Sequence, residues 1–339
     1  MAPRVLVLAG GLSHERDVSL RSGRRVAESL RDAGCAVELR DVDAGLLPRL
    51  RSGDIDVVWP LLHGATGEDG AIREVLDLAD VPYVGATAAA CRVAWDKAVA
   101  RQVAGEAGLA CPDAVVLPQE TFRELGAGAI LQAILARLGL PLVVKPVRGG
   151  SALGVSVVRA AADLPRAMVD AFAYGEVALV EQYVSGTEVA VSVLDTAGKG
   201  PLALPPVEIV ADGGVYDYDA RYTAGATEFF CPARLDDAAT ANALAAALLA
   251  HRAFGLRDLS RTDLIVDGAG TPWFLEVNVA PGMTETSLLP QSVLAAGSAQ
   301  PALYRAIAEA ALLRGRRSAR GGGVDAAHRA VRAAAAQAG

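Results

Sequence analysis

The stretch that decides the fold runs from Arg261 to Pro290 and reads RTDLIVDGAGTPWFLEVNVAPGMTETSLLP. Two apolar runs within it, Leu264 to Val266 and Trp273 to Val277, flank the segment from Asp267 to Gly270. Apolar runs separated by a short segment that contains glycine are typical of a β-hairpin. The sequence therefore predicts two antiparallel strands here, followed by the turn from Ala280 to Thr284.

The predicted register of this hairpin brings two carboxylates together. If Asp267 and Thr271-Pro272 close the loop, Asp263 lies opposite Glu276 and Arg261 lies opposite Asn278. All four side chains share one face, because strand side chains alternate. Opposed carboxylates repel each other in a bare sheet, whereas two carboxylates and an amide are ligands that Mg²⁺ accepts together with phosphate oxygens. The hairpin alone leaves a second interpretation open, the solvated outer face of an edge hairpin.

Length, composition and charge limit the class of protein. The chain has 339 residues, enough for two or three domains with cores of their own. Its formal net charge of -7 argues against binding to nucleic acid, which needs a basic surface. No run approaches the roughly 18 apolar residues of a membrane span, and the N-terminal apolar run is too short for a signal peptide. The four cysteines have no C-x-x-C spacing, so we expect a cytoplasmic protein with reduced thiols.

The order of apolar strands and amphipathic helices predicts α/β units. The strand from Val5 to Leu8 is fully apolar, as in a parallel strand buried on both faces, and Pro82 to Gly85 is a further predicted strand. Gly10-Gly11 and His63-Gly64 follow two strands, where ligands of parallel sheets bind. The expected segments are an N-terminal substrate-binding domain (1–96), a central domain (97–184), a C-terminal catalytic domain (185–313) that ends in a helix from Pro301 to Leu313, and a tail (314–339) that is disordered or a loose helix.

A glycine-rich loop, Arg148 to Gly154, lies between two predicted strands. It lacks the G-x-x-x-x-G-K-[ST] pattern of a P-loop and does not join a strand to a helix, as a dinucleotide-binding turn does. Glycines still let backbone N–H groups approach phosphate oxygens closely. Lys145, at the end of the preceding strand, is costly to bury unless an anion pairs with it. A phosphate-binding hairpin and an ordinary hairpin both remain open.

Motifs along the chain, taken together, are similar to those of a known family. They are Gly10 to Leu20 (GGLSHERDVSL), His63 to Gly70 (HGATGEDG), Lys145 to Ser151 (KPVRGGS), Asp217 to Tyr222 (DYDARY), Arg261 to Asp263 (RTD) and Glu276 to Leu288 (EVNVAPGMTETSL). Each motif alone is weak. In this order and at ordinary spacing, they resemble the D-alanine–D-alanine ligases of the ATP-grasp superfamily over residues 4 to 313.

The resemblance implies a fold and a reaction. The fold class is α/β, with the three-domain ATP-grasp architecture and an N-terminal parallel-sheet domain of the biotin-carboxylase-like preATP-grasp type. ATP would lie between the central and C-terminal domains. The carboxylate of one D-alanine would attack the γ-phosphate to give D-alanyl phosphate, and the amine of a second D-alanine would displace phosphate for peptidoglycan precursor synthesis. Such chemistry depends on positioning and on stabilisation of phosphoryl charge. The family also implies a homodimer formed through the N-terminal domain.

The resemblance further implies roles for individual residues. The catalytic positions are Glu15, Ser151, Tyr222, Arg261 and Gly282. The substrate-binding positions are Glu15, His63, Ser287 and Leu288. The ATP-binding positions are Lys97, Lys145, Glu181, Tyr183, Val184, Glu188 and Arg221. The metal-binding positions are Asp263, Glu276 and Asn278, which would hold two Mg²⁺ ions, with Mn²⁺ as an alternative.

Two residues differ from the family pattern, and we expect them to affect the rate of the reaction more than its nature. Arg221 stands where most relatives have lysine, and a guanidinium binds phosphate as a planar fork, not as a compact charge. Ala152 stands where the phosphate loop usually has a second serine. The segment from Ala211 to Gly225 is rich in Gly and Asp and has no apolar period, so we predict a mobile lid.

Two alternative functions stay open at this point. The first is a related ligase that uses D-serine, D-lactate or another second substrate. Tyr222 favours an amine nucleophile, because ester-forming relatives often differ at that position. The second is a nucleotide-binding protein that has lost catalysis, against which the metal-binding residues and Arg261 argue.

Overall fold

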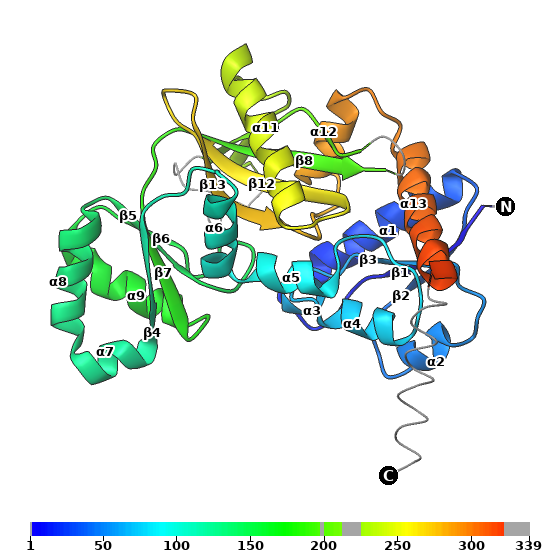
Figure 1. Ribbon diagram of the computed structural model, residues 1–339, viewed down its shortest axis with the longest axis horizontal. Coiled ribbons are helices and arrows are strands. Elements are labelled where there is room, and N and C mark those ends of the chain that lie inside the picture. The colour runs from blue at the N-terminus through cyan, green and yellow to red at the C-terminus, as the bar shows by residue number, and fades with distance from the viewer. Residues whose placement is uncertain (1, 197–199, 212–224, 322–339) are drawn as a thin grey trace, which may run out of the picture.

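The computed structural model of the chain describes residues 2–196, 200–211 and 225–321, with side chains in the last helix described as far as residue 315. In this described part, three β-sheets follow one another along the chain (Figure 1). Their strands lie within residues 4–60, 114–182 and 187–278. The α/β class predicted from the sequence is therefore confirmed.

The N-terminal sheet is parallel and is covered on both faces. Its strands run in the order β2 (Ala36–Arg40), β1 (Arg4–Leu8) and β3 (Val57–Pro60). The helices over one face are α1 (Arg16–Asp32) and α13 (Gln300–Gly321), and those over the other are α2 (Leu46–Leu50) and α4 (Ala71–Leu78). The predicted strand from Pro82 to Gly85 is only an isolated bridge between Tyr83 and Val58. Pro82 has no N–H to donate to a ladder, and Gly85 turns away at a φ of 100°.

The last helix differs from the prediction in both length and partner. The sequence predicts that it ends at residue 313 within the C-terminal unit, but α13 continues to Gly321 and packs on the N-terminal sheet beside α1 (Figure 1). The ring of Tyr304 in α13 meets Trp59 of β3 edge to face, with 5.7 Å between ring centroids. Arg314 binds both carboxylate oxygens of buried Asp258 at 2.6 Å. Residue 314 is therefore part of a docked helix, and residues 322–339 lie outside the described chain.

The central sheet is antiparallel. Its strands run in the order β4 (Ala114–Pro118), β7 (Val177–Gln182), β5 (Leu142–Pro146) and β6 (Ser156–Val158). The helices that accompany it are α7 (Gln119–Leu125), α8 (Ala127–Leu138) and α9 (Leu164–Phe172), preceded by a 3-10 turn, η1 (Ala161–Asp163). Residues of α8 and α9 share a core with β5, β6 and β7.

The C-terminal sheet is the largest and is also antiparallel. Its strands run in the order β11 (Thr227–Phe230), β10 (Val207–Ala211), β8 (Thr187–Asp195), β12 (Asp258–Val266) and β13 (Pro272–Asn278), with β9 (Leu202–Ala203) beside β8. The remaining helices are α3 (Ala65–Glu68), α5 (Ala88–Trp95), α6 (Lys97–Glu106), α11 (Asp237–Ala253) and α12 (Leu288–Ala295). Alanines of α11 pack on one face of this sheet, which leaves its other face for the site described below.

The register of the β12–β13 hairpin confirms the predicted pairs and adds a bulge. Asp263 pairs with Glu276, and Arg261 pairs with Asn278. Beyond Asp263 the register shifts by one, so that Leu264 pairs with Phe274 and Leu275 is the extra residue. The loop end of the hairpin is therefore offset by one residue from the prediction.

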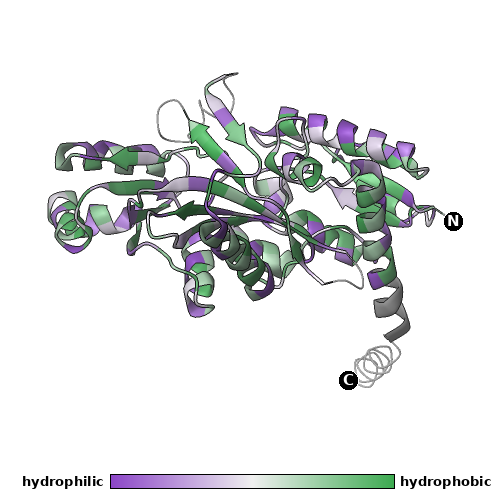
Figure 2. Ribbon diagram, turned by 90° about the horizontal axis from the view of Figure 1, so that it is seen from above, coloured by the Kyte–Doolittle hydropathy of each residue, from purple (hydrophilic) through white to green (hydrophobic). Residues whose placement is uncertain are grey.

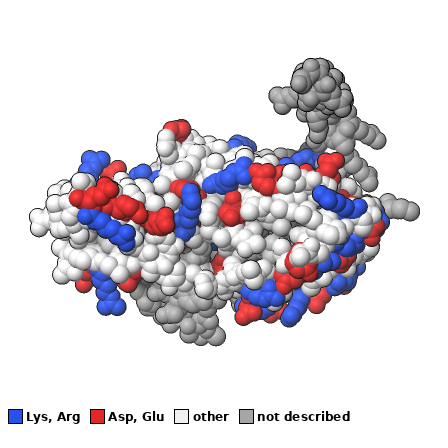
Figure 3. All heavy atoms as spheres, turned by 90° about the horizontal axis from the view of Figure 1, so that it is seen from below, with Lys and Arg blue, Asp and Glu red and all other residues white. Residues whose placement is uncertain are grey.

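Hydropathy and charge follow this layered arrangement. In Figure 2 the interior strands are mostly hydrophobic, while the outer helices alternate between hydrophobic and hydrophilic bands. On the face seen in Figure 3, basic and acidic side chains are interspersed. Elsewhere in the described chain, exposed ion pairs include Arg92 and Glu74, 2.6 Å apart. Exposed pairs contribute only about 0–1 kcal/mol each. No helix within the described residues is long and apolar enough to span a membrane.

Candidate active site

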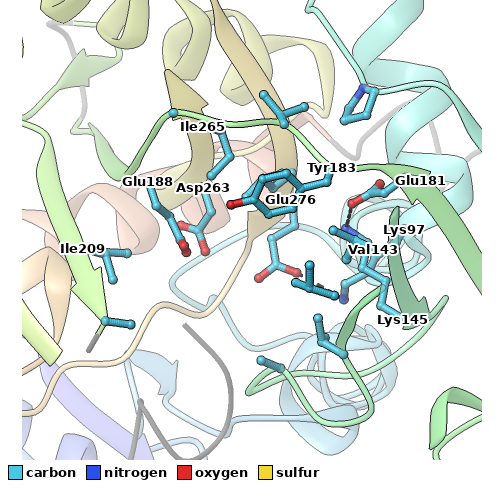
Figure 4. Close-up of a pocket in the computed structure, with 18 of the residues that line it drawn as sticks. Lys97, Val143, Lys145, Glu181, Tyr183, Glu188, Ile209, Asp263, Ile265 and Glu276 are labelled. Carbon is cyan, nitrogen blue, oxygen red and sulfur yellow. Dashed lines mark hydrogen bonds and ion pairs between the residues drawn. The ribbon is translucent and has the colours of Figure 1, made fainter. Parts of the chain in front are cut away.

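A cavity of about 450 Å³ lies between the central and C-terminal sheets, within the roughly 300–1,000 Å³ range of small-molecule sites. It has an apolar part and a charged part (Figure 4). The apolar part is formed by Val143, Val157, Ile209, Ile265 and Leu275. Tyr183 and Val184, just after β7, also line it. An apolar slot of this kind suits a flat heteroaromatic ring.

The bulge in β13 shapes this cavity. In a regular strand, consecutive side chains point to opposite faces, so Leu275 and Glu276 would not both reach one pocket. Here both line the cavity, because the extra residue at Leu275 turns its side chain to the same face as Glu276. The bulge thus places an apolar wall next to a carboxylate. Because strand side chains alternate, Ile265 lies on the same face as Asp263, so the sequence indicates its place at the cavity. Nothing in the sequence indicates that Leu275 lines the cavity too.

A buried ion pair stands at the charged side of the cavity. Lys145 Nζ donates to Glu181 Oε1 at 2.6 Å, and both side chains are at least nine-tenths buried (Figure 4). The two residues come from neighbouring strands, β5 and β7. The sequence requires an anion for Lys145, and within the described chain that anion is Glu181. Breaking such a pair leaves an uncompensated buried charge.

Lys97 connects the glycine-rich loop to the hairpin. It is the first residue of α6, whose start is fixed by Asp96, which accepts a hydrogen bond from the Val99 N–H at 3.2 Å. Its ammonium donates to the Gly149 carbonyl at 2.7 Å and lies 3.2 Å from Glu276 Oε2. A single lysine thereby holds the loop near the carboxylate of β13.

The hairpin offers oxygen donors that suit Mg²⁺. Asp263 and Glu276 stand opposite each other, and the side-chain oxygen of Asn278 accepts the Ala280 N–H at 2.8 Å, which leaves one lone pair. Arg261 donates to both oxygens of Asp263 at 2.7 Å. No three His, Cys, Asp or Glu side chains in the described residues form a ready cage. Mg²⁺ does not need one, because it takes one or two carboxylates and completes its shell with water and phosphate.

Glu188 adds a further carboxylate to the cavity. It lies on β8 opposite Ile265 of β12, and its carboxylate points toward that of Asp263 (Figure 4). The acidic side chains that line the cavity are Glu181, Glu188, Glu208, Asp263 and Glu276. Carboxylates of this kind can accept hydroxyl groups or hold a cation.

The glycine-rich loop joins the cavity to a second site in the N-terminal domain. Gly149, Gly150 and Ala152 line the cavity, while the Ser151 hydroxyl donates a hydrogen bond to Glu15 Oε1. Ser151 and Ala152 have φ values of 52° and 55°, a left-handed conformation that residues other than glycine rarely adopt. A Cβ on Gly150 would lie 3.2 Å from Glu15 Oε2. The loop therefore has the nucleotide-sized cavity on one side and Glu15 on the other.

Two carboxylates share the second site. Glu68 Oε1 accepts the Gly64 N–H at 3.1 Å, and Glu15 Oε2 would be 2.9 Å from a Cβ on Gly64. Burial, with the nearby charge of Glu15, raises the pKa of Glu68 to about 8. No Lys or Arg of the described residues forms an ion pair with either carboxylate. The sequence interprets Glu68 only as part of a helix start, and its burial against Glu15 becomes visible only in the fold.

His63, a predicted substrate-binding residue, is buried, and both of its ring nitrogens have hydrogen-bond partners within the protein. It is 4% exposed, with Nδ1 3.1 Å from the Ala280 carbonyl and Nε2 3.2 Å from Ser22 Oγ. Burial lowers the pKa of the imidazole. Both ring nitrogens are therefore occupied by the protein, which the sequence does not predict.

The turn after β13 and the start of α12 close the site. Ser287 precedes α12, and its hydroxyl accepts the Thr284 N–H at 2.9 Å. Leu288 is the first residue of α12 and is 5% exposed. Gly282 fits closely, since a Cβ there would lie 2.7 Å from Ser287 Oγ. Of the predicted site residues, Arg221 and Tyr222 lie outside the described chain, as do residues 212–224 of the predicted lid.

Comparisons with known proteins agree with this architecture. Two family models match, D-ala D-ala ligase C-terminus over residues 103–309 and D-ala D-ala ligase N-terminus over residues 45–86. D-alanine–D-alanine ligase of Anaeromyxobacter dehalogenans is 43% identical, covering 92% of this chain and 97% of its own length. The same enzyme of Bordetella avium is 40% identical, with 94% and 98% covered.

Solved structures give the same result. VanG D-Ala:D-Ser ligase from Enterococcus faecalis superposes with a TM-score of 0.80 at 26% identity, covering 92% of this chain and all of that one. D-alanine–D-alanine ligase from Bacillus anthracis complexed with ATP superposes with a TM-score of 0.77 at 28% identity, covering 94% and 100%. The fold and the cavity thus define an ATP-grasp ligase. Within that class, the chain belongs to the D-alanine–D-alanine ligase family.

Proposed function

We propose that this protein joins two molecules of D-alanine at the expense of ATP, with D-alanyl phosphate as intermediate and D-alanyl-D-alanine, ADP and phosphate as products. Family membership supports the reaction. One observation carries the proposal: the loop from Gly149 to Ala152 lines the cavity and also contacts Glu15. An amino acid held at Glu15 would have its carboxylate beside the phosphate end of the cavity, as phosphoryl transfer requires.

The cavity supplies the groups that ATP needs. The apolar part accepts the adenine ring, with Tyr183 and Val184 beside its edge, and Glu188 accepts ribose hydroxyls. Lys97 and Lys145 bind phosphate oxygens, together with backbone N–H groups of the glycine-rich loop. This assignment rests on where these side chains line the cavity. Glu181 then has two partners, Lys145 and an amino group of the adenine.

Asp263, Glu276 and Asn278 would hold two Mg²⁺ ions. When bound, Mg²⁺ would supply positive charge to the phosphate oxygens. Lys97, 3.2 Å from Glu276, then turns its charge toward phosphate. Arg261, which binds Asp263 in this structure, shares its guanidinium between Asp263 and the reacting carbonyl.

The second site binds the amino acids. Glu15 takes the ammonium of the first D-alanine, because it is a carboxylate without a basic partner in the described chain. Arg261 and the Gly282 N–H stabilise the oxyanion as the second amine attacks. Ser287 and Leu288, at the start of α12, bind the carboxylate of the second substrate at a helix N-terminus. Tyr222 and Arg221 complete the site by resemblance.

Product analysis tests the proposal directly. The purified protein is incubated with ATP, Mg²⁺ and D-alanine, and ADP, phosphate and dipeptide are measured together. We expect the three products in equal amounts and none with L-alanine. Competition with D-serine and D-lactate then identifies the second substrate. A mixed dipeptide or an ester as the main product would favour a related ligase, and no turnover with ATP bound would favour a non-catalytic relative.

The proposal includes a cytoplasmic location and a homodimer. All four cysteines are free thiols, and burial raises the pKa of each, which suits a reducing compartment. The homodimer rests on the family resemblance. Light scattering coupled to gel filtration measures it, and a single mass near 34.8 kDa would contradict it.

A further inference from the structure

A hydrogen-bond network links the N-terminal domain to the turn from Ala280 to Met283. Its N-terminal members are Ser22 of α1, which is fully buried, and His63, which follows β3. The Met283 N–H donates to Ser22 Oγ at 3.1 Å. Ser22 Oγ lies 3.2 Å from His63 Nε2, and His63 Nδ1 lies 3.1 Å from the Ala280 carbonyl. The turn is therefore held at both of its ends by the other domain.

The positions of the protons follow from the partners. The Ala280 carbonyl can only accept, so Nδ1 of His63 carries a hydrogen. Burial keeps the imidazole neutral by lowering its pKa, so Nε2 has no hydrogen and accepts one. Ser22 then donates its hydroxyl to Nε2 while its oxygen accepts the Met283 N–H. Every group in the network has a partner in this arrangement, which fixes the Nδ1–H tautomer of His63.

Between the two held ends lies Gly282. Its N–H makes no hydrogen bond with any part of the chain that the structure describes. The neighbouring hydroxyl, Ser287 Oγ, is already an acceptor for the Thr284 N–H at 2.9 Å. An N–H that no described residue accepts, in a turn that is fixed at both ends, is a preorganised hydrogen-bond donor. The direction of this donor depends on the network through Ala280 and Met283.

We propose that Ser22 and His63 together are positioning residues, which hold Met283 and Ala280 and so aim the Gly282 N–H at the reacting carbonyl. His63 is thereby a link between two domains and not a ligand of the substrate. This inference rests on the proposed function, because it concerns the oxyanion donor of that reaction. It also explains why the buried face of α1 carries a serine where it meets the turn from Ala280 to Met283.

The first test is Ser22→Ala. The variant removes the donor to Nε2 and the acceptor of the Met283 N–H, so the turn loses one of its two holds. We expect kcat to fall about 10-fold, less than the roughly 10²–10³-fold of deleting an oxyanion donor outright. The KM values for ATP and D-alanine should stay within about two-fold, since neither binding group is touched.

The chain offers a matched control. Ser260 of β12 binds His251 Nδ1 at 2.8 Å, and both residues are as buried as the Ser22–His63 pair. This second pair faces α11, away from the cavity. Ser260→Ala should lower the melting temperature without lowering kcat at a temperature where the variant is folded. Equal kcat losses in Ser22→Ala and Ser260→Ala would overturn the proposal, because the loss of any buried hydrogen bond would then explain both.

A double-mutant cycle tests whether Ser22 and His63 hold the turn as one network. His63→Asn keeps an amide donor near the position of Nδ1 and loses the Nε2 acceptor. If Nε2 fixes the Ser22 hydroxyl that receives the Met283 N–H, the loss of kcat in the double variant should be smaller than the product of the two single losses. Losses that multiply would show that the two residues act independently and would overturn the inference. Ser22→Cys, with a weaker S–H donor, is the milder change if Ala prevents folding, and should give a smaller loss of kcat.

A spectroscopic measurement separates this inference from the proposed function. The ¹⁵N and ¹³C shifts of the His63 ring report its tautomer without any turnover. The parent should show the Nδ1–H form from pH 6 to 8, and Ser22→Ala should show a mixture. A parent with the Nε2–H form would overturn the network even if ligation is observed. Failure to ligate D-alanine, with the Nδ1–H form present, would overturn the function and leave the network standing.

Discussion

The cavity between the central and C-terminal sheets and the second site around Glu15 differ in how their carboxylates are paired. In the cavity, Glu181 pairs with Lys145 at 2.6 Å, and Glu276 lies 3.2 Å from Lys97. Asp263, on the same hairpin, is bound by Arg261 at 2.7 Å. In the site around Glu15, no Lys or Arg of the described residues forms an ion pair with Glu15 or Glu68, and the more distant charge of Lys97 only acts against the rise in the pKa of Glu68. Direct ion pairs with the protein therefore neutralise the carboxylates of the cavity but not those of the second site.

This difference predicts what each site requires of its ligand. A site with balanced charges must exchange partners when an anionic phosphate binds, so its basic residues would turn to the phosphate and its carboxylates would be free to hold a cation. A site with two unbalanced carboxylates is completed by a cation. Burial and the charge of Glu15 already raise the pKa of Glu68 to about 8, so that Glu68 is protonated near neutral pH. An ammonium beside Glu15 relieves the same repulsion.

The largest expected effect comes from removing the negative charge of Glu276 on the β12–β13 hairpin. Glu276→Gln should lower kcat about 10³-fold or more, because a carboxylate that holds the metal contributes several kcal/mol to stabilising phosphoryl charge. The fold should persist, since Gln has the same shape and Lys97 keeps its bond to the Gly149 carbonyl at 2.7 Å. ADP release, measured as a function of Mg²⁺ concentration, gives both kcat and metal dependence.

A surface carboxylate serves as the control for this variant. Glu124→Gln, on the exposed part of α7, should match the parent in both measurements. Near-normal turnover of Glu276→Gln with unchanged Mg²⁺ dependence would contradict the assignment of the metal site.

The second effect compares a buried and an exposed ion pair of equal length. Glu181→Leu leaves Lys145 buried and unpaired, so the free energy of unfolding should fall by about 3–5 kcal/mol. Glu74→Leu breaks the pair with Arg92, which has the same distance of 2.6 Å but lies at the surface, and should cost about 1 kcal/mol or less. Urea denaturation measures both.

Removing both partners of the buried pair separates charge from packing. Lys145→Met combined with Glu181→Leu should recover most of the lost stability, because no unpaired charge remains. If the double variant is as unstable as Glu181→Leu alone, packing and not charge explains the loss.

The third effect tests the unbalanced site. Glu15→Gln should raise KM for D-alanine about 10- to 150-fold, as expected for the loss of a charged hydrogen bond worth about 1.5–3 kcal/mol. KM for ATP should change little, because Glu15 does not line the cavity. Initial rates with each substrate varied in turn decide the matter, and equal increases in both KM values would contradict a separate amino-acid site.

Local sequence patterns predicted the hairpin well and the bulge not at all. Alternation and a short glycine-containing loop were sufficient to pair Asp263 with Glu276, since both depend on neighbours in sequence. The extra residue at Leu275 leaves the apolar pattern unchanged, so the sequence carries no sign of it. The demand for an anion beside Lys145 was also correct, but only the fold identifies Glu181 as that anion.

Contacts between segments that are far apart in the sequence could not be predicted, for a different reason. The apolar stripe of α13 could cover either domain, and it packs on the N-terminal sheet because apolar residues of α1, β1 and β3 form a core with it. Ser22 looks like any buried helical serine until Met283 is placed next to it. Glu68 likewise fits a helix start, and its raised pKa arises from burial beside Glu15, 53 positions earlier in the chain. Each of these features is a property of the packed domains.

The most specific effect concerns the proton on Glu68. Its pKa is about 8 in the folded protein against an ordinary value of 4.5, so the folded state binds this proton more tightly than the unfolded state does. The resulting stabilisation is complete below pH 4.5 and is lost as the pH rises through about 8. In this window the free energy of unfolding should fall by up to about 1.4 kcal/mol per pH unit. Glu68→Gln cannot lose the proton, so its stability relative to the parent should rise from pH 5 to 8 and level off above about 9, whereas Glu124→Gln should follow the parent throughout. Denaturation at each pH without substrate measures the difference, and adding D-alanine should reduce it, because an ammonium beside Glu15 lowers the pKa of Glu68. A difference that is flat with pH would mean that Glu68 is already ionised, and that a cation other than the substrate balances this site.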